Sequence, residues 1–219
     1  MAQQLVDRRD LDFVIWEQMQ SESLLKNDKY KEFNKKTCDM IITEARTLAI
    51  KEMLPTLAEG DKQGVRYDKG SVKVPDCFHD VFKLILEGEW QTLGMPPEMG
   101  GQGAPGFVSA ACSEYFLAAN WALYSYASMG NGTALLIQLY GTPEQKEKYI
   151  PNITAAKWGG TMLLTESEAG SDVGALETTA VKNEDGTYTL TGNKIFITNG
   201  EHDLAENIIH PVLARIEGD

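Results

Sequence analysis

The sequence predicts an α+β protein, in which an all-α helical domain is followed by an incomplete antiparallel β-domain. In the first part apolar residues recur at three- and four-residue spacing, for example over residues 33–57, which is the period of a buried helix face. After Trp158-Gly-Gly160 this spacing disappears, and short alternating segments separated by turn residues begin. We therefore expect a helical domain over residues 1–158 and a β-domain over residues 159–219, whose last strand has no evident successor.

Several helices are expected in the first part of the chain. Phe13-Val-Ile-Trp16 opens the first one, and the next spans residues 33–57, with Pro55 at its expected end. The stretch 107–129 is long, apolar and free of proline and glycine, so it predicts a buried helix. Further helices are expected over residues 77–87 and 133–140, with a short hairpin at Asp68-Lys-Gly70.

Thr142-Pro-Glu-Gln145 carries the signals of a helix start. Thr142 suits the N-cap, proline suits the first helical position, and Gln145 completes a capping box with Thr142. Glu144 interacts favourably with the positive end of the helix dipole. Pro151 is expected to stop this short helix, to which we assign no chemistry.

The β-domain is predicted from short apolar or alternating runs bounded by turn residues. Asn183-Glu-Asp-Gly186 is a good hairpin turn between two of them. Pro211 lies inside the last run and implies an edge or a bulge there, because proline cannot donate to a strand ladder. The strands expected here span residues 161–164, 178–182, 187–191, 194–198 and 207–215.

Gly101, Gly103 and Gly106 match the G-x-G-x-x-G fingerprint of dinucleotide-binding folds. That fingerprint requires a buried strand directly before it and an acidic residue about 20 positions after it. Here the preceding residues are Met95-Pro-Pro-Glu-Met99, and Tyr126 stands where the acidic residue is required. We therefore interpret the glycines as a loop that leads into a helix.

Two of the expected strands end in a threonine just before the chain turns, at Thr165 and at Thr198. Two hydroxyl groups and a loop of free backbone N–H groups, beside the ring of Phe196, suit a flat heteroaromatic ligand bonded at its edge. The alternative is that these threonines only cap strand ends, since turn chemistry alone explains them.

Beyond this reading from the residues, Thr165-Glu-Ser-Glu-Ala-Gly-Ser-Asp172 and Phe196-Ile-Thr-Asn-Gly200 resemble the paired signatures of the acyl-CoA dehydrogenase family of flavoenzymes. The similarity extends back through Gly141-Thr-Pro-Glu-Gln-Lys-Glu-Lys-Tyr-Ile-Pro151 and Glu98-Met-Gly-Gly-Gln-Gly103, so it covers most of the chain from about Trp90 onward. The long N-terminal part is similar to the larger members, including those that act on methylthio-propionyl or longer acyl thioesters.

The resemblance implies FAD as the cofactor and α,β-dehydrogenation of an acyl-CoA thioester, with hydride passing to flavin N5. The base that removes the α-proton is in this family a glutamate of the C-terminal helical bundle, which this chain lacks, so no catalytic residue is assigned here. Glu166 and Glu168 are tempting substitutes, but we expect them to be solvated or to cap N–H groups in their turn.

The resemblance also implies residues for each part of the site. Met162, Leu164 and Thr165 would face the flavin from one segment, with Thr165 on the pyrimidine edge through its hydroxyl and backbone. Phe196, Ile197 and Thr198 would form the other wall, with Thr198 near N5. Gly170 and Ser171 would lie where the CoA arm passes the flavin, so Ser171 also counts as a substrate contact. Glu168 departs from the smaller or neutral residue usual in the family.

Small residues between the helices of residues 107–129 and 133–140 have two readings. One is tight helix packing, because glycine lets backbones approach closely. The other, implied by the resemblance, is the floor of an acyl pocket, with Tyr124, Ser128 and Gly132 as substrate contacts.

The composition bounds the remaining classes of function. A net charge of −12 argues against nucleic-acid binding, which needs clustered lysine and arginine. Three scattered cysteines, no signal peptide and no apolar run long enough for a membrane span favour a cytoplasmic protein. His79, His202 and His210 do not have metal-ligand spacing, so no metal site is expected.

The partners that the resemblance implies are an acyl-CoA substrate and an electron-transfer flavoprotein. The rest of the enzyme would come from a C-terminal remainder or from a second subunit, and a homo-oligomer is expected. Two alternatives stay open: an acyl-CoA oxidase that uses O2, or a non-catalytic fragment that binds flavin or acyl-CoA.

Overall fold

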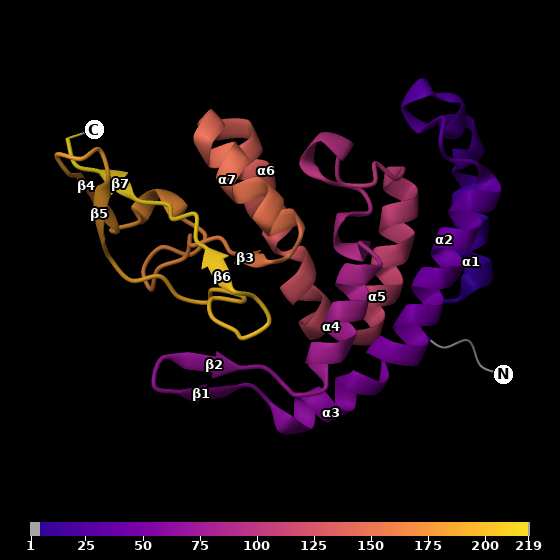
Figure 1. The fold of residues 1–219 in the computed structure, drawn as a ribbon, viewed down its shortest axis with the longest axis horizontal. Helices are drawn as coiled ribbons and strands as arrows, with labels where there is room; N and C mark the ends of the chain where they lie inside the picture. Colours follow the sequence, from indigo (N-terminus) through magenta and orange to yellow (C-terminus); the bar gives the residue numbers. More distant parts are fainter. Residues whose placement is uncertain (1–4, 219) are drawn as a thin grey trace.

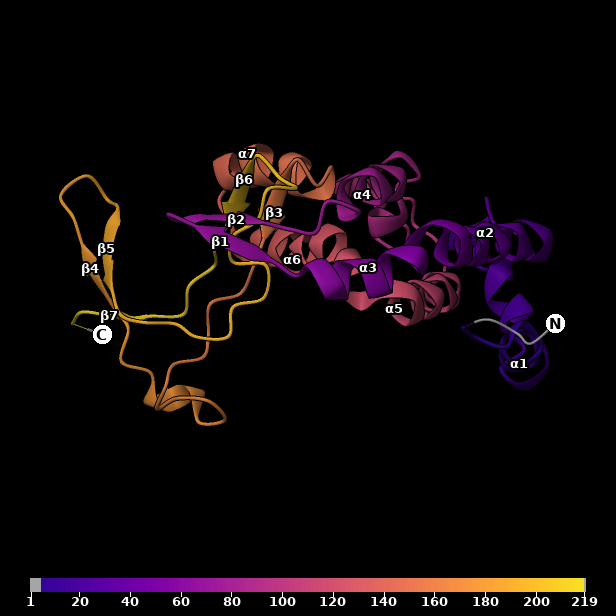
Figure 2. The ribbon, with the colours of Figure 1, turned by 90° about the horizontal axis from the view of Figure 1, so that it is seen from below.

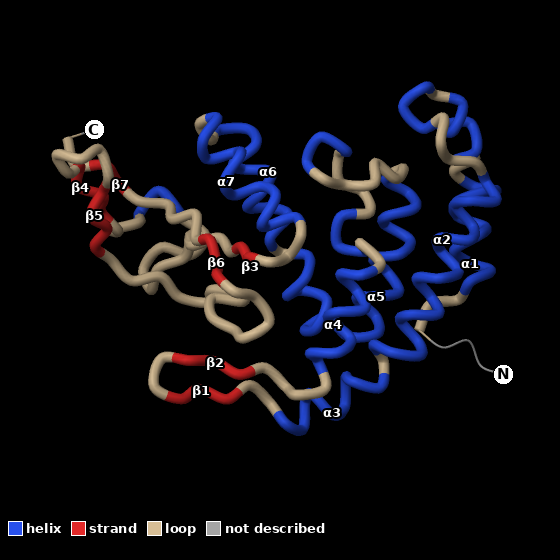
Figure 3. The backbone as a smooth tube through the Cα atoms, in the orientation of Figure 1, coloured by secondary structure: helices blue, strands red, loops and turns tan. Residues whose placement is uncertain are grey.

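A computed structural model of the chain describes residues 5–218 (Figure 1). The helices follow one another across the molecule from α1 and α2 to α6 and α7, and strands β3–β7 lie beyond them towards the C-terminal end (Figures 1 and 3). The helices are α1 (Arg8–Asp12), α2 (Lys35–Leu48), α3 (Pro55–Gln63), α4 (Phe78–Glu87), α5 (Gly106–Ser128), α6 (Gly130–Tyr140) and α7 (Pro143–Thr154). The strands are β1 (Arg66–Asp68), β2 (Ser71–Lys73), β3 (Trp158–Gly160), β4 (Thr179–Lys182), β5 (Tyr188–Thr191), β6 (Asn207–Ile209) and β7 (Arg215–Ile216).

The second expected helix is confirmed in its position, but the first begins at Arg8, before the expected opening at Phe13, and one expected end is wrong. Helix α1 begins after Asp7, whose carboxylate caps it, and continues as a π-helical turn over Phe13–Gln18. Helix α2 passes through a second π-helical turn, Ala49–Met53, and Pro55 then begins α3 instead of ending the helix. Proline is tolerated in a first turn because its missing N–H would have no intrahelical partner there.

Helix α5 is the centre of the helical core and packs against α2, α3 and α4. Tyr115 and Phe116 of this helix are fully buried. The expected helix is confirmed, with a kink at Asn120, whose backbone is not helical. The Asn120 amide donates to Thr56 Oγ1 over 2.9 Å, and its oxygen accepts from the Leu123 N–H over 3.0 Å. These bonds satisfy a buried polar side chain at the kink.

The capping box of α7 is confirmed. The Gln145 N–H donates to Thr142 Oγ1 over 3.3 Å, and the Thr142 N–H donates to Gln145 Oε1 over 2.9 Å. The expected stop at Pro151 is wrong, because the helix runs on to Thr154.

We expect Thr142→Ala to lower the free energy of unfolding by about 1 kcal/mol, because it removes an N-cap acceptor. Urea unfolding followed by circular dichroism measures the change. Thr142→Ser, which keeps the hydroxyl, serves as the matched control and is expected to restore most of the loss. An alanine variant as stable as the parent would contradict the capping role.

The glycine-rich stretch before α5 is a loop, as predicted, and α5 begins at Gly106. Gly101 is needed for a close approach, since a Cβ atom there would lie 2.1 Å from the Met95 carbonyl oxygen. Gly103 has a φ of +64°, in the left-handed region that favours glycine. Packing and backbone conformation thus explain these two glycines.

Within residues 5–218 the strands form three small sheets, and not all of their pairs are antiparallel. The expected hairpins are confirmed as β1–β2 and β4–β5, and the latter stands away from the helices (Figure 2). Two pairs depart from the antiparallel expectation, because β3 pairs with β6 and β4 pairs with β7 in parallel. The last expected strand is divided into β6 and β7, with Pro211 between them.

Candidate functional site

The two threonine-ended segments lie side by side. The Ile195 N–H donates to the Thr165 carbonyl over 2.9 Å, which joins them directly. The segment before Thr165 is extended and continues the parallel pairing of β3 with β6, because the Leu163 N–H donates to the Pro211 carbonyl over 2.9 Å. Neither segment is a regular strand, apart from a single bridge between Leu163 and Val212.

A buried carboxylate fixes this arrangement. Glu166 accepts hydrogen bonds from the Glu177 N–H over 2.6 Å and from the Thr178 N–H over 3.0 Å. Its Oε1 also lies 2.7 Å from Lys194 Nζ. The prediction that Glu166 caps N–H groups is therefore confirmed, while Glu168 is exposed in the same loop.

Lys194 is the residue that sequence reasoning missed. Its ammonium also donates to the Leu164 carbonyl over 2.9 Å, so it links both threonine-ended segments. The side chains of Lys194 and Glu166 are only 6% and 9% exposed. The signal for it in the sequence is a single charged residue at the head of the apolar run 195–197, with a glutamate in the loop after Thr165.

Hydrogen bonds lower the pKa of Glu166 from 4.5 to about 2, above all those from the Glu177 N–H, the Lys194 ammonium and the Thr178 hydroxyl. A carboxyl group whose pKa is lowered by folding stabilises the fold above its ordinary pKa, and this contribution is lost as the pH falls towards the folded-state pKa.

We expect the stability difference between the parent and Glu166→Gln to shrink as the pH falls, in roughly the window from pH 5 to pH 2 in which Glu166 becomes protonated. Urea unfolding across this range measures it, with the exposed Glu168→Gln as control. A difference that does not vary with pH would contradict the ionised network.

Phe196 is the most unusual residue of the second segment. Its side chain is 88% exposed, and its φ is +60°. A bulky residue in the left-handed region is a true outlier and costs about 1–3 kcal/mol. The surrounding structure must hold it there, and such strain is concentrated at binding sites.

The other predicted flavin contacts line the same region with mixed exposure. Met162 is 43% exposed, while Leu164, Thr165 and Ile197 are half-buried. Within residues 5–218, the N–H and hydroxyl of Thr165 have no hydrogen-bond acceptor. The donors of Thr165 are therefore available to a ligand. The remaining predicted contacts are all exposed: Gly170, Ser171 and Thr198.

The segment after Thr198 docks on the helices. Asn199, with a φ of +57°, accepts a long hydrogen bond of 3.5 Å from Ser125 Oγ of α5. The ring of His202 is buried and packs edge-on against Tyr126, also in α5, at 4.8 Å between centroids. This burial lowers the pKa of His202. Asp203 accepts from the Val74 N–H over 3.0 Å. The second segment is thus held in place relative to α5.

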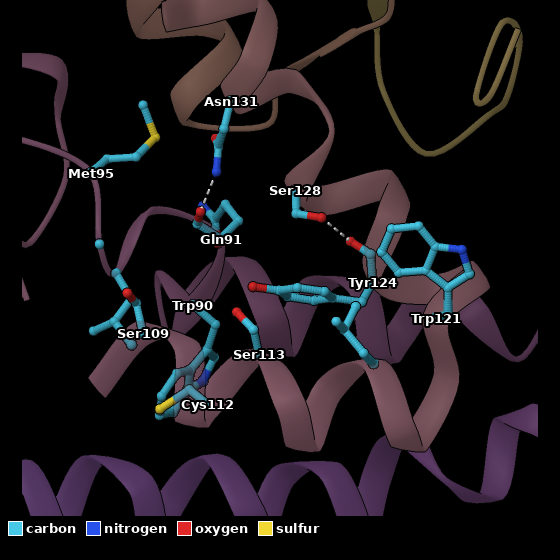
Figure 4. A pocket seen from close by; sticks show the side chains of 13 residues that line it. Trp90, Gln91, Met95, Ser109, Cys112, Ser113, Trp121, Tyr124, Ser128 and Asn131 are labelled. Atoms are coloured by element: carbon cyan, nitrogen blue, oxygen red, sulfur yellow. Dashed lines mark hydrogen bonds between the residues drawn. The ribbon is translucent and has the colours of Figure 1, made fainter. Parts of the chain in front are cut away.

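A cavity of about 450 Å³ lies along α5 and is lined by its residues from Ser109 to Ser128 (Figure 4). Tyr124 and Ser128, two of the four predicted substrate contacts, line it together, whereas Ser171 does not line it. Gly132 does not line it: it is exposed in the first turn of α6, with nothing near the position of a Cβ atom. The tight-packing reading applies instead to Gly130, which lies against Ile153 and Gly160.

The cavity wall mixes aromatic and polar groups. Burial raises the pKa of Tyr124, although a hydrogen bond with Ser113 acts in the opposite direction. The side-chain oxygens of Gln91 and Asn131 are buried, and no described residue donates to them. Trp90 and Trp121 supply apolar surface. Such a wall suits a ligand that is mainly apolar and carries a few polar groups.

Residues 5–218 contain no group of three histidine, cysteine, aspartate or glutamate side chains that could hold a metal ion. None of the helices in this range combines the length and apolar character that crossing a membrane requires.

Known proteins resemble the chain along most of its length. A 3-methylmercaptopropionyl-CoA dehydrogenase of Ruegeria pomeroyi is 41% identical over 165 residues, which are 75% of this chain and 28% of that protein. A broad-specificity linear acyl-CoA dehydrogenase of Mycobacterium tuberculosis is 37% identical over 213 residues, 96% of this chain and 34% of that protein. The chain therefore spans about a third of the length of these curated relatives.

The fold is also that of solved structures. An acyl-CoA dehydrogenase of Bacillus anthracis, complexed with FAD, has a TM-score of 0.64 at 27% identity, over 86% of this chain and 30% of that one. The family model of the acyl-CoA dehydrogenase N-terminal domain matches residues 35–157, more than half of the chain, and that of the middle domain matches residues 161–217. The chain thus belongs to the acyl-CoA dehydrogenase family.

Proposed function

We propose that the chain is the N-terminal part of an FAD-dependent acyl-CoA dehydrogenase, which desaturates an acyl-CoA thioester between its α and β carbons. The observation that carries this proposal is the pair of joined segments, with free Thr165 donors on one and an exposed, strained Phe196 on the other. We also propose that residues 1–158 form its helical domain and residues 159–219 its β-domain.

The residues present fit a flavin ring. Thr165 would donate to the pyrimidine edge, and Met162 and Leu164 would face the ring beside it. Phe196 and Ile197 would form the opposite wall, with Thr198 close to N5. Gly170 and Ser171 would border the CoA arm. Bound FAD would supply the acceptor for the two electrons that leave the substrate, and the chain's own residues would bind and orient it.

The cavity beside α5 is the proposed acyl site. Its volume of about 450 Å³ lies within the range of small-molecule pockets. Tyr124 and Ser128 would contact the acyl group, and Gly132, which does not line the cavity, is left out of the proposed contacts. The α-proton would be removed by a glutamate outside residues 1–219, because Glu166, the buried glutamate described at this site, is engaged with Lys194 and with two N–H groups.

Further parts of the proposal concern partners and location. The remainder of the enzyme would come from a C-terminal region or a second subunit, and the assembly would be a cytoplasmic homo-oligomer. Electrons would pass on to an electron-transfer flavoprotein. The assignment to an acyl-CoA dehydrogenase is supported by the similarity to the Mycobacterium tuberculosis enzyme, which covers 96% of this chain.

A reconstitution experiment tests the proposed function. The chain is assayed alone and together with a polypeptide that corresponds to the C-terminal part of the relatives, with FAD, an acyl-CoA and an artificial electron acceptor. We expect turnover only in the combined sample. FAD binding without turnover in the combined sample would favour a non-catalytic binding subunit, and aerobic formation of peroxide would favour an oxidase.

We expect Thr198→Val in the complete enzyme to slow flavin reduction by about tenfold, with little change in the Kd of acyl-CoA. Loss of one hydrogen bond that is made mainly in the transition state removes about 1.4 kcal/mol, which corresponds to that factor. Stopped-flow absorbance measures the reduction rate. Thr198→Ser keeps the hydroxyl and is expected to remain close to the parent. A valine variant with an unchanged rate would refute this role of Thr198.

A further inference from the structure

Lys194 has a place in the site that goes beyond holding the loop. Its ammonium lies 2.7 Å from Glu166 Oε1 and 2.9 Å from the Leu164 carbonyl oxygen. At 6% exposure it is shielded from water, so these electrostatic contacts are stronger than they would be on the surface. A buried ion pair is tolerated only when its remaining donors and acceptors are satisfied, and here the Glu177 and Thr178 N–H groups complete the carboxylate.

The geometry of one peptide group connects Lys194 to the ligand side. The Leu164 carbonyl and the Thr165 N–H belong to the same planar peptide unit, in which they point in opposite directions. Lys194 therefore binds one end of this unit. The other end is the Thr165 N–H, to which no residue among 5–218 offers an acceptor.

We propose that Lys194 is a positioning residue that strengthens the Thr165 N–H as a hydrogen-bond donor to the flavin, by polarising the peptide group between Leu164 and Thr165. Hydrogen bonds in a chain polarise one another, by about 10–30% per bond. This inference rests on the proposed function, since the acceptor is the pyrimidine edge of the flavin. Glu166 holds the ammonium against the Leu164 carbonyl and offsets part of its charge.

A stronger Thr165 N–H donor would stabilise bound reduced flavin more than bound oxidised flavin. Reduction adds electron density to the pyrimidine edge, and a donor is worth more to an acceptor that carries charge. Lys194 therefore raises the affinity for reduced flavin relative to oxidised flavin. A merely structural role would affect both redox states equally.

The test compares Lys194→Met with the parent in the complete, FAD-loaded enzyme. We expect binding of reduced FAD to weaken about tenfold relative to binding of oxidised FAD, which for a two-electron couple corresponds to a midpoint potential lower by about 30 mV. Spectroscopic redox titration gives the potential, and fluorescence titration gives the affinity for oxidised FAD. Lys194→Arg keeps the charge and is expected to restore most of the potential.

Two further variants separate charge from structure. Glu166→Gln leaves the ammonium on the Leu164 carbonyl without its counter-charge, so we expect the potential to rise. Lys157→Met removes a lysine from an exposed pair with Glu206 at 3.5 Å, and we expect no change.

Three outcomes would overturn the inference. One is an equal loss of affinity for both redox states in Lys194→Met, and another is an unchanged potential. The third is a lower midpoint potential in Glu166→Gln than in the parent. This variant tests the inference even where Lys194→Met does not fold. Failure of the parent enzyme itself to bind FAD would refute the proposed function, and it is therefore distinct from these results.

Discussion

Replacing Phe116 with alanine is expected to lower the free energy of unfolding by about 3–5 kcal/mol. The ring is 1% exposed and lies between two aromatic partners, Trp90 at 5.4 Å and Tyr124 at 5.0 Å between centroids. The loss combines the transfer energy of the ring with the cavity that its removal leaves. Because both partners also line the candidate acyl cavity, the substitution is expected to weaken acyl-CoA binding as well. Urea unfolding and a binding titration measure the two effects.

Phe13→Ala is the matched control for this prediction. Its side chain is 46% exposed, so the same change is expected to cost less than about 1 kcal/mol. If the two variants lost equal stability, the central position of Phe116 in the core would be contradicted.

Gly101→Ala is expected to destabilise the chain by about 3 kcal/mol, at the upper end of the usual range for overpacking. The added Cβ atom would meet the Met95 carbonyl oxygen at 2.1 Å and its carbonyl carbon at 2.4 Å, and both belong to the backbone. No side-chain rotation relieves such a contact, so the loop must move. Thermal unfolding measures the loss.

The third glycine of the same pattern supplies the comparison. Nothing lies within 4 Å of a Cβ atom at Gly106, which is the first residue of α5. Gly106→Ala is therefore expected to leave stability unchanged or to raise it by up to about 1 kcal/mol. If Gly106→Ala were as unstable as Gly101→Ala, all the glycines of the G-x-G-x-x-G pattern would be required together. That result would contradict the explanation of Gly101 by its close contact with Met95.

Helix positions could be predicted because apolar spacing follows the buried face of each helix. Two proline arguments failed for a local reason. Proline blocks a helix by removing an N–H and by crowding the preceding turn. At Pro55 no N–H is needed, and at Pro151 the carbonyl left without an intrahelical donor belongs to Glu147, an exposed residue.

The candidate site was predicted only in part, for a different reason. Thr165 and Thr198 were found from local signals, since each follows an apolar run and precedes a turn. The pair formed by Glu166 and Lys194 depends on contacts between segments that are distant along the chain, as does the parallel pairing of β3 with β6. Local patterns in one sequence do not specify which distant segments meet.

From the pairing of β3 with β6 we also expect an order of events during folding. Trp158–Gly160 has no strand partner until Asn207–Ile209 has been synthesised, and the long intervening segment must close as a loop before the pair gains any stability. The backbone hydrogen bonds within a helix join residues only four apart, so the helices can form earlier. In a pulse-labelling hydrogen-exchange experiment, the amides of α5 should therefore become protected before those that join β3 to β6. Assembly of the ligand-facing segments is then among the last steps by which this chain reaches its native state.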